Sequence, residues 1–142
     1  MTREELIQKI AEAISVVEGF ASGKSRVAVE NCNPGNIRRW SAGGKPYPTR
    51  NGYVDFCAWA GGDRARGLTE GWRVLRVLVG QYMSGAFHAG RSPSLYQMFE
   101  TYAPATDRNS PKAYAEFVAK RIGTSPDIPL SEVVDDTRAV VS

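Results

Sequence analysis

The feature that most constrains this chain is a capped, amphipathic helix at its start. Thr2 followed three residues later by Glu5 forms a capping box, in which each side chain accepts a hydrogen bond from the other residue's backbone N–H. Apolar residues then recur at steps of three and four, as a helix with one buried face requires: Leu6, Ile7, Ile10, Ala11, Ile14 and Val17. The sequence therefore predicts a helix that begins after Thr2 and ends near Gly19.

The next part of the chain has the pattern of a small β segment. Turn residues gather between residues 25 and 56, at Asn33-Pro34-Gly35-Asn36, 41–45 and Asn51-Gly52. Short extended runs at 37–40 and 53–57 lie between these turns. We therefore expect a hairpin-like segment here.

Helical patterns return after Gly67. Thr69 is a candidate N-cap for a helix that stops at Gly85. Serine before proline is typical of a helix start, and it predicts helices over 93–102, opened by Ser92, and over 111–122, opened by Ser110 and closed by Gly123. Ser131 is expected to cap a last helix running into Val140. The expected fold class is α+β and mostly helical.

Composition sets the size and class of the protein. The 142 residues, 42% hydrophobic and 23% charged, predict one domain over residues 1–142. No apolar run approaches the roughly 20 residues of a membrane span, so we expect no membrane insertion. Charged residues interrupt the apolar residues of the first helix, so we expect no secretory signal. Two cysteines and one histidine are too few for a structural zinc site, and we expect no metal and no cofactor.

Positive charge is concentrated in the middle of the chain. Residues 24–91 contain eleven basic and four acidic residues, a net charge of +7, and nine of the eleven are arginine. Such a segment favours an anionic partner, which could be nucleic acid, a lipid surface or an acidic wall polymer.

Glu18 lies on the apolar side of the first helix. Ile7, Ala11, Ile14 and Glu18 follow one another at steps of four, three and four. Partial burial and the negative end of the helix dipole both disfavour an ionised carboxyl, and we expect them to raise its pKa toward the range of a general acid. The alternative is a terminal glutamate directed into water.

Two groups of motifs resemble a known family. Val17-Glu18-Gly19-Phe20 followed by Asn33-Pro34-Gly35-Asn36-Ile37-Arg38 is similar to the muralytic domains of phage virions and prophages, relatives of soluble lytic transglycosylases and goose-type lysozymes. The later motifs agree in order and spacing: Tyr102-Ala103-Pro104, 107–110, Ala113-Tyr114, Val118-Ala119, Gly123 and Ser125-Pro126-Asp127. The resemblance spans roughly residues 10 to 130.

The resemblance implies a lysozyme-like fold that cleaves the β-1,4 bond between N-acetylmuramic acid and N-acetylglucosamine in peptidoglycan. It implies Glu18 as the catalytic acid and Tyr114 as a tyrosine that hydrogen-bonds this acid. The same motifs place Asn33, Asn36, Arg38 and Tyr102 at the substrate. The expected partners are the glycan strand and other virion or secretion-machine proteins, and the enzyme would reach the periplasm or wall in a phage particle, through a holin or by a secretion machine.

The sequence departs from the family at two points. Gly19 stands where lytic transglycosylases usually have serine, and Asp107-Arg108 stands where related virion domains often have Glu-Asn, so a substrate contact is altered or moved to Asn109. Glu30, Asp55 and Asp63 are the acids that could assist Glu18 as a second carboxylate. Without one, the sugar's own 6-hydroxyl closes an anhydro ring, which is the outcome we expect.

Cations and aromatic residues are mixed in the β segment. Arg38-Arg39-Trp40 lies near Tyr47, Tyr53 and Trp59, and such side chains suit sugar rings and anionic groups as well as bases. The alternatives are that the tryptophans belong to the core, that the protein is a catalytically silent wall-binding or structural virion component, or that it is a small DNA-binding module. The apolar stripe of the 69–82 helix argues against DNA.

Overall fold

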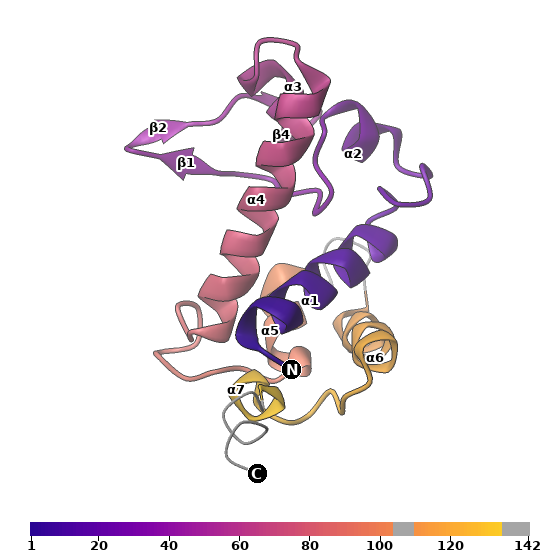
Figure 1. Ribbon diagram of the computed structural model, residues 1–142, viewed down its shortest axis with the longest axis vertical. Coiled ribbons are helices and arrows are strands. Elements are labelled where there is room, and N and C mark those ends of the chain that lie inside the picture. The colour runs from indigo at the N-terminus through magenta and orange to yellow at the C-terminus, as the bar shows by residue number, and fades with distance from the viewer. Residues whose placement is uncertain (104–109, 135–142) are drawn as a thin grey trace. The chain divides into compact units, whose positions relative to one another are not determined.

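The structure is a computed structural model that describes residues 1–103 and 110–134 (Figure 1). It is α+β and mostly helical, as expected, with two small antiparallel hairpins. The elements are α1 (Arg3–Val17), α2 (Arg26–Glu30), β1 (Ser41–Ala42), β2 (Lys45–Pro46), β3 (Thr49–Arg50), β4 (Tyr53–Val54), α3 (Phe56–Trp59), α4 (Arg64–Met83), α5 (Leu95–Tyr102), α6 (Pro111–Ile122) and α7 (Leu130–Val133).

These elements form two compact units. Residues 14–77 make up one, called here the hairpin unit, and the described residues of 1–13 and 78–134 belong to the other, called here the helical unit. Helices α1 and α4 each contribute residues to both units. The expectation of a single domain over residues 1–142 stays a prediction.

The capping box at the start of α1 is confirmed. The Glu5 N–H donates to the Thr2 hydroxyl, and the Thr2 N–H donates to the Glu5 carboxylate, both at 3.1 Å. The helix then presents its apolar stripe to the interior, where Leu6 and Ile10 have no exposed surface. It ends at Val17, close to the predicted end.

The β segment consists of two short hairpins. Strand β1 pairs with β2, and β3 pairs with β4. The second hairpin turns at Asn51-Gly52, whose φ angles of 57° and 84° are those of the two-residue turn that this dipeptide favours. Of the predicted extended runs, only Tyr53–Val54 is a strand. Helices α2 and α3 were not predicted, because five and four residues are too few for a helical repeat to show.

Helix α4 begins earlier than predicted. Asp63 caps it by accepting a hydrogen bond of 3.1 Å from the Arg66 N–H, whereas the Thr69 hydroxyl lies within the helix and donates to the Ala65 carbonyl at 3.0 Å. The predicted N-cap was therefore wrong. The predicted stop at Gly85 agrees with the structure, since its φ of +85° turns the chain shortly after the helix ends.

The last helices agree with the sequence in part. Helix α6 has the predicted bounds, with the Ser110 hydroxyl accepting from the Ala113 N–H and Gly123 in the left-handed conformation. Helix α5 begins at Leu95 rather than 93, because Ser94 rather than Ser92 forms the capping box. Helix α7 begins after Pro129, so Ser131 is not its cap. The expected extension to Val140 lies outside the described residues.

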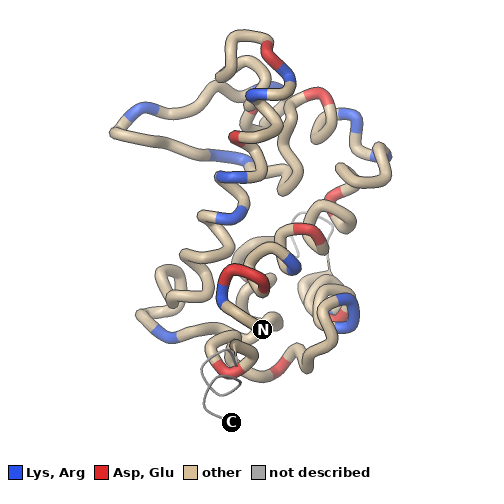
Figure 2. Tube along the Cα trace, in the orientation of Figure 1, with Lys and Arg blue, Asp and Glu red and all other residues tan. Residues whose placement is uncertain are grey.

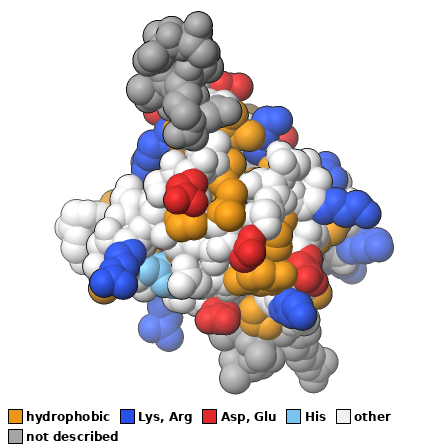
Figure 3. All heavy atoms as spheres, turned by 90° about the horizontal axis from the view of Figure 1, so that it is seen from below, with side chains coloured by type: hydrophobic (Ala, Val, Ile, Leu, Met, Phe, Trp, Pro, Cys, Tyr) orange, Lys and Arg blue, Asp and Glu red, His pale blue; other side chains and the backbone are white. Residues whose placement is uncertain are grey.

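Apolar side chains also reach the surface of the helical unit. Phe87 is 46% exposed and Phe117 is 39% exposed. The face drawn in Figure 3 has hydrophobic side chains next to acidic ones, together with His88, the only histidine of the chain. Basic residues lie on the hairpins, the region of α2 and α4, and also on α1 and α6 (Figure 2).

Candidate functional site

Glu18 is the residue that caps the C-terminus of α1. The next residue, Gly19, donates its N–H to the Val16 carbonyl at 3.2 Å, and Phe20 donates to the Ser15 carbonyl at 3.0 Å. This pair of bonds, with Gly19 at a φ of +80°, is a Schellman motif. The backbone of Glu18 is therefore fixed by the helix and the turn, and the residue is partly buried.

The turn after Glu18 explains why glycine follows it. A Cβ on Gly19 would lie 3.0 Å from the Ser25 nitrogen, and that nitrogen donates to the Gly19 carbonyl at 3.0 Å. The Phe20 ring then packs edge-on against Trp72 of α4, with the centroids 6.0 Å apart. A serine at position 19 would meet both the positive φ and the close approach of Ser25, so the glycine at this position has a structural cause.

The Asn33 side chain forms hydrogen bonds within the hairpin unit. Its Nδ2 donates to the carbonyls of Ile37 and Val54, at 2.9 and 3.0 Å, and its Oδ1 accepts from the Ile37 N–H at 2.9 Å. The residue has no exposed surface. These bonds hold the 33–37 turn on β4, and a substrate contact by this side chain would have to break them. The binding of substrate by Asn33 stays a prediction.

Asn36 and Arg38 extend from this turn. Asn36 has a φ of +48°, and its Oδ1 is buried without a hydrogen-bond partner among the described residues. The exposed Arg38 has its guanidinium carbon 5.3 Å from the centre of the Tyr53 ring. The two residues lie at the end of the turn that Asn33 fixes, and their binding of substrate stays a prediction.

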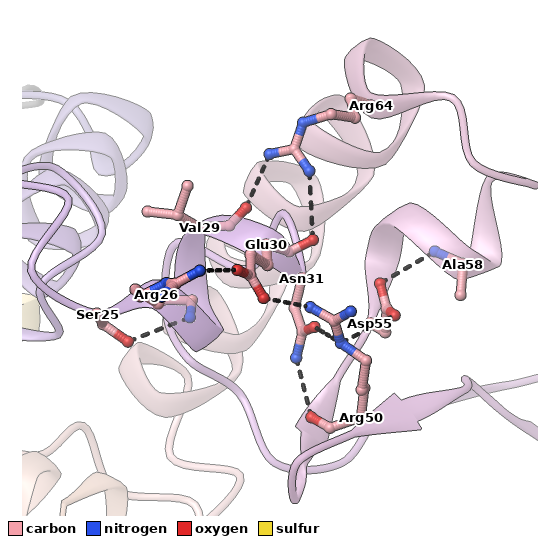
Figure 4. A network of polar contacts seen from close by, with 10 residues as sticks. Ser25, Arg26, Val29, Glu30, Asn31, Arg50, Asp55, Ala58 and Arg64 are labelled. Carbon is pink, nitrogen blue, oxygen red and sulfur yellow. Dashed lines mark hydrogen bonds and ion pairs between the residues drawn. The ribbon is translucent and has the colours of Figure 1, made fainter.

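The three acids considered as a second carboxylate each contact an arginine or a backbone N–H group of the chain. Glu30 bonds Arg26 at 3.3 Å and Arg50 at 2.8 Å, and Figure 4 draws both contacts. Asp55 caps α3 through its Oδ1, and Asp63 caps α4 as described above. Each of these carboxylates thus stabilises a local element of the hairpin unit.

A fourth acid, Glu70, was not singled out from the sequence. Its Oε1 accepts from Arg73 Nε at 2.7 Å, and its Oε2 accepts from Arg73 Nη2 at 2.8 Å and from the Tyr47 hydroxyl at 2.5 Å. The Arg73 hydrogen bonds lower the pKa of Glu70, and the Tyr47 bond acts in the same direction. The only sequence signal was the spacing of three between Glu70 and Arg73 on one helix.

Tyr47 connects Glu70 to an aromatic cluster. Its ring stacks on Trp59, with the centroids 5.5 Å apart and the planes 3° apart, and it also meets Phe56 edge-on. The Arg66 guanidinium carbon lies 4.8 Å from the Trp59 ring centre. Tyr47 is 8% exposed and belongs to the core. Trp59 is partly exposed, and the Arg66 guanidinium lies over its ring.

Many arginines of the basic segment are used inside the chain. Arg64, for example, donates to the carbonyls of Val29 at 2.8 Å and Glu30 at 3.3 Å (Figure 4). Six of the nine arginines in residues 24–91 have such a contact: Arg26, Arg38, Arg50, Arg64, Arg66 and Arg73. Most arginines of this segment therefore contact other residues of the chain, which argues against a surface devoted to nucleic acid.

The two tyrosines named by the resemblance lie together in the helical unit. Tyr114 is buried and stacks on Phe99, with centroids 4.2 Å apart. Tyr102 meets both rings edge-on, at 6.3 Å from Tyr114 and 5.8 Å from Phe99. Glu18 belongs to the hairpin unit, and its hydrogen bond with Tyr114 stays a prediction. The expected contacts of residues 104–109 lie outside the described residues.

No family model, no curated protein and no solved structure matches this chain. Within residues 1–103 and 110–134, no three histidine, cysteine, aspartate or glutamate side chains gather as ligands for a metal ion. No helix in the same described part is both long and apolar enough to cross a membrane.

Proposed function

We propose that this chain is a lysozyme-like domain that cleaves the β-1,4 bond between N-acetylmuramic acid and N-acetylglucosamine in peptidoglycan. The observation that carries the proposal is the position of Glu18 as the C-cap of α1, fixed by a Schellman motif. An acid at the end of the first long helix is what the resemblance requires of the catalytic residue. Tyr114 is the proposed positioning residue for this acid.

In the proposed reaction Glu18 acts alone. Its carboxyl proton passes to the glycosidic oxygen as that bond breaks, and the carboxylate then takes a proton from the 6-hydroxyl of the muramic acid as this oxygen closes a 1,6-anhydro ring. Residues 14–77 contain four other acids, and all four have structural partners: Glu30, Asp55, Asp63 and Glu70. This supports a mechanism without a second carboxylate.

The glycan is proposed to bind where cations lie over aromatic rings. Arg38 over Tyr53 and Arg66 over Trp59 combine an apolar face with a positive charge. The carboxylates of the wall polymer are attracted by these guanidinium groups. The proposed setting is the periplasm or cell wall, reached with virion or secretion-machine partners.

Digestion of purified peptidoglycan, followed by mass spectrometry of the released fragments, tests the reaction. Anhydro ends lack one water relative to reducing ends, and we expect them to predominate. A digest with only reducing ends would show that water, rather than the 6-hydroxyl, captures the cleaved sugar. Release of no soluble fragment by the folded protein would reject the enzyme and favour a catalytically silent wall-binding component.

A further inference from the structure

The two cysteines of the chain lie next to a backbone contact between distant segments. The Phe56 N–H donates to the Asn31 carbonyl at 2.9 Å. Cys32 and Cys57 each follow one member of this pair in the chain. A hydrogen bond of this kind brings the residues that follow it into the same neighbourhood, although they are far apart in sequence.

Both cysteines also pack against one face of α4. The Cys32 sulfur lies 3.8 Å from the Arg64 carbonyl oxygen. A Cβ on Gly67 would lie 3.0 Å from the Cys57 Cα, and one on Gly71 would lie 2.2 Å from the Cys32 carbonyl oxygen. Positions 64, 67 and 71 are three and four residues apart and therefore share a helix face. The thiols thus approach α4 from the same side.

The two thiols differ in exposure. Cys32 has no exposed surface, whereas Cys57 is partly exposed. Burial raises the pKa of the Cys32 thiol to about 11, and the neighbouring Cys57 thiol acts in the same direction. Neither cysteine is in a disulfide in this structure. Cys57 is therefore the group that a reagent in solvent meets first, with Cys32 behind it.

We propose that Cys32 and Cys57 form an intramolecular disulfide when the chain meets a small-molecule disulfide such as oxidised glutathione. The Cys57 thiolate attacks the reagent and releases one thiol, and the Cys32 thiolate then attacks the Cys57 sulfur and releases the second. The protein loses two thiol protons and two electrons, and the reagent is reduced to two thiols. This inference does not rest on the proposed function.

The disulfide would close the loop of residues 32–57. This loop contains the Asn33 turn, both hairpins and Tyr47. A covalent link at its base restricts the unfolded chain far more than the folded one, where the ends are already adjacent. Oxidation would therefore stabilise the hairpin unit outside a reducing compartment, and reduction would relax it.

The test compares the intact reduced chain with the same chain after incubation in oxidised glutathione. We expect both thiols to become inaccessible to a maleimide under denaturing conditions, with a mass lower by two hydrogens and no glutathione adduct. Non-reducing peptide mapping is expected to recover residues 32 and 57 in one linked fragment. The melting temperature is expected to rise by roughly 5 to 12 °C and to return on addition of dithiothreitol.

Cys57→Ser is the matched control, since it removes the exposed thiol and leaves the buried one. We expect its melting temperature to be the same with and without oxidant. Three results on the unsubstituted chain would overturn the proposal: two thiols that stay reactive after oxidation, a stable glutathione adduct on Cys57 that Cys32 does not displace, or a disulfide-linked dimer in place of the internal bond.

Discussion

The Tyr47 hydroxyl donates a hydrogen bond of 2.5 Å to Oε2 of Glu70, which joins the chain between the two hairpins to α4. The carboxylate is completed by two bonds from Arg73. Because the Glu70 side chain is 9% exposed, little water is available to replace a lost partner. This cluster therefore ties the segment between β2 and β3 to α4 through buried polar contacts.

Replacing Glu70 by glutamine is expected to lower the free energy of unfolding at pH 7 by about 1 to 3 kcal/mol, because a charged hydrogen-bond acceptor is lost. The Arg73 bonds hold the folded pKa of Glu70 below the usual range of a glutamate carboxyl. A lowered carboxyl pKa gives stability that is present above the unfolded pKa and is lost as the pH falls through the folded pKa. Urea denaturation should show the difference from wild type shrinking as the pH falls below about 4.5.

Glu30→Gln is the control for this experiment, since that carboxylate also pairs with arginine but its side chain is 45% exposed. We expect it to change stability by less than about 1 kcal/mol. A difference between Glu70→Gln and wild type that is the same at pH 7 and pH 3 would contradict the assigned role of Glu70.

The turn that positions Glu18 gives a second prediction. Gly19→Ala adds a Cβ at positive φ and 3.0 Å from the Ser25 nitrogen, whereas Gly23→Ala adds one at a φ of +75° with nothing within 4 Å. We expect both variants to be destabilised by about 1 kcal/mol through backbone strain, and Gly19→Ala by about 1 kcal/mol more through crowding. Equal melting temperatures for the two variants would show that Ser25 does not crowd position 19.

Gly71 and Gly80 form a matched pair within α4. A Cβ at Gly71 would meet the Cys32 carbonyl at 2.2 Å, while one at Gly80 meets the guanidinium end of the Arg3 side chain at 3.3 Å. Gly71→Ala is expected to lose about 2 to 4 kcal/mol, because backbone must move. Gly80→Ala is expected to be neutral or to gain up to about 1 kcal/mol from helix propensity. Chemical denaturation of both variants decides this, and a stable Gly71→Ala would refute the close packing of the 32–34 turn on α4.

Local signals explain which parts of the fold were predictable. The Thr2–Glu5 box and the Ser110–Pro111 start specify α1 and α6, because caps act on residues three positions away. The residue type alone does not identify the cap that a helix uses. Asp63 rather than Thr69 starts α4, and α2 and α3 are stabilised by caps and tertiary contacts rather than by a repeat of their own.

The site was less predictable than the fold, because its roles depend on tertiary partners. Asn33 was expected at the substrate, yet its amide is used by Ile37 and Val54. Glu70 was overlooked, since its partner Tyr47 lies 23 residues away in the chain. Glu18 could be chosen from the sequence because helix periodicity and a motif agree at that position.

The most direct test of the central claim is the release of soluble muropeptides from purified peptidoglycan by Glu18→Gln. The variant keeps the shape of the side chain but has no acidic proton, so we expect the rate to fall by about 10² to 10⁴ with the fold intact by circular dichroism. Glu12→Gln, an exposed glutamate on the same helix, is expected to keep the rate of the unsubstituted chain. Muropeptide release by Glu18→Gln at the rate of Glu12→Gln would contradict the account.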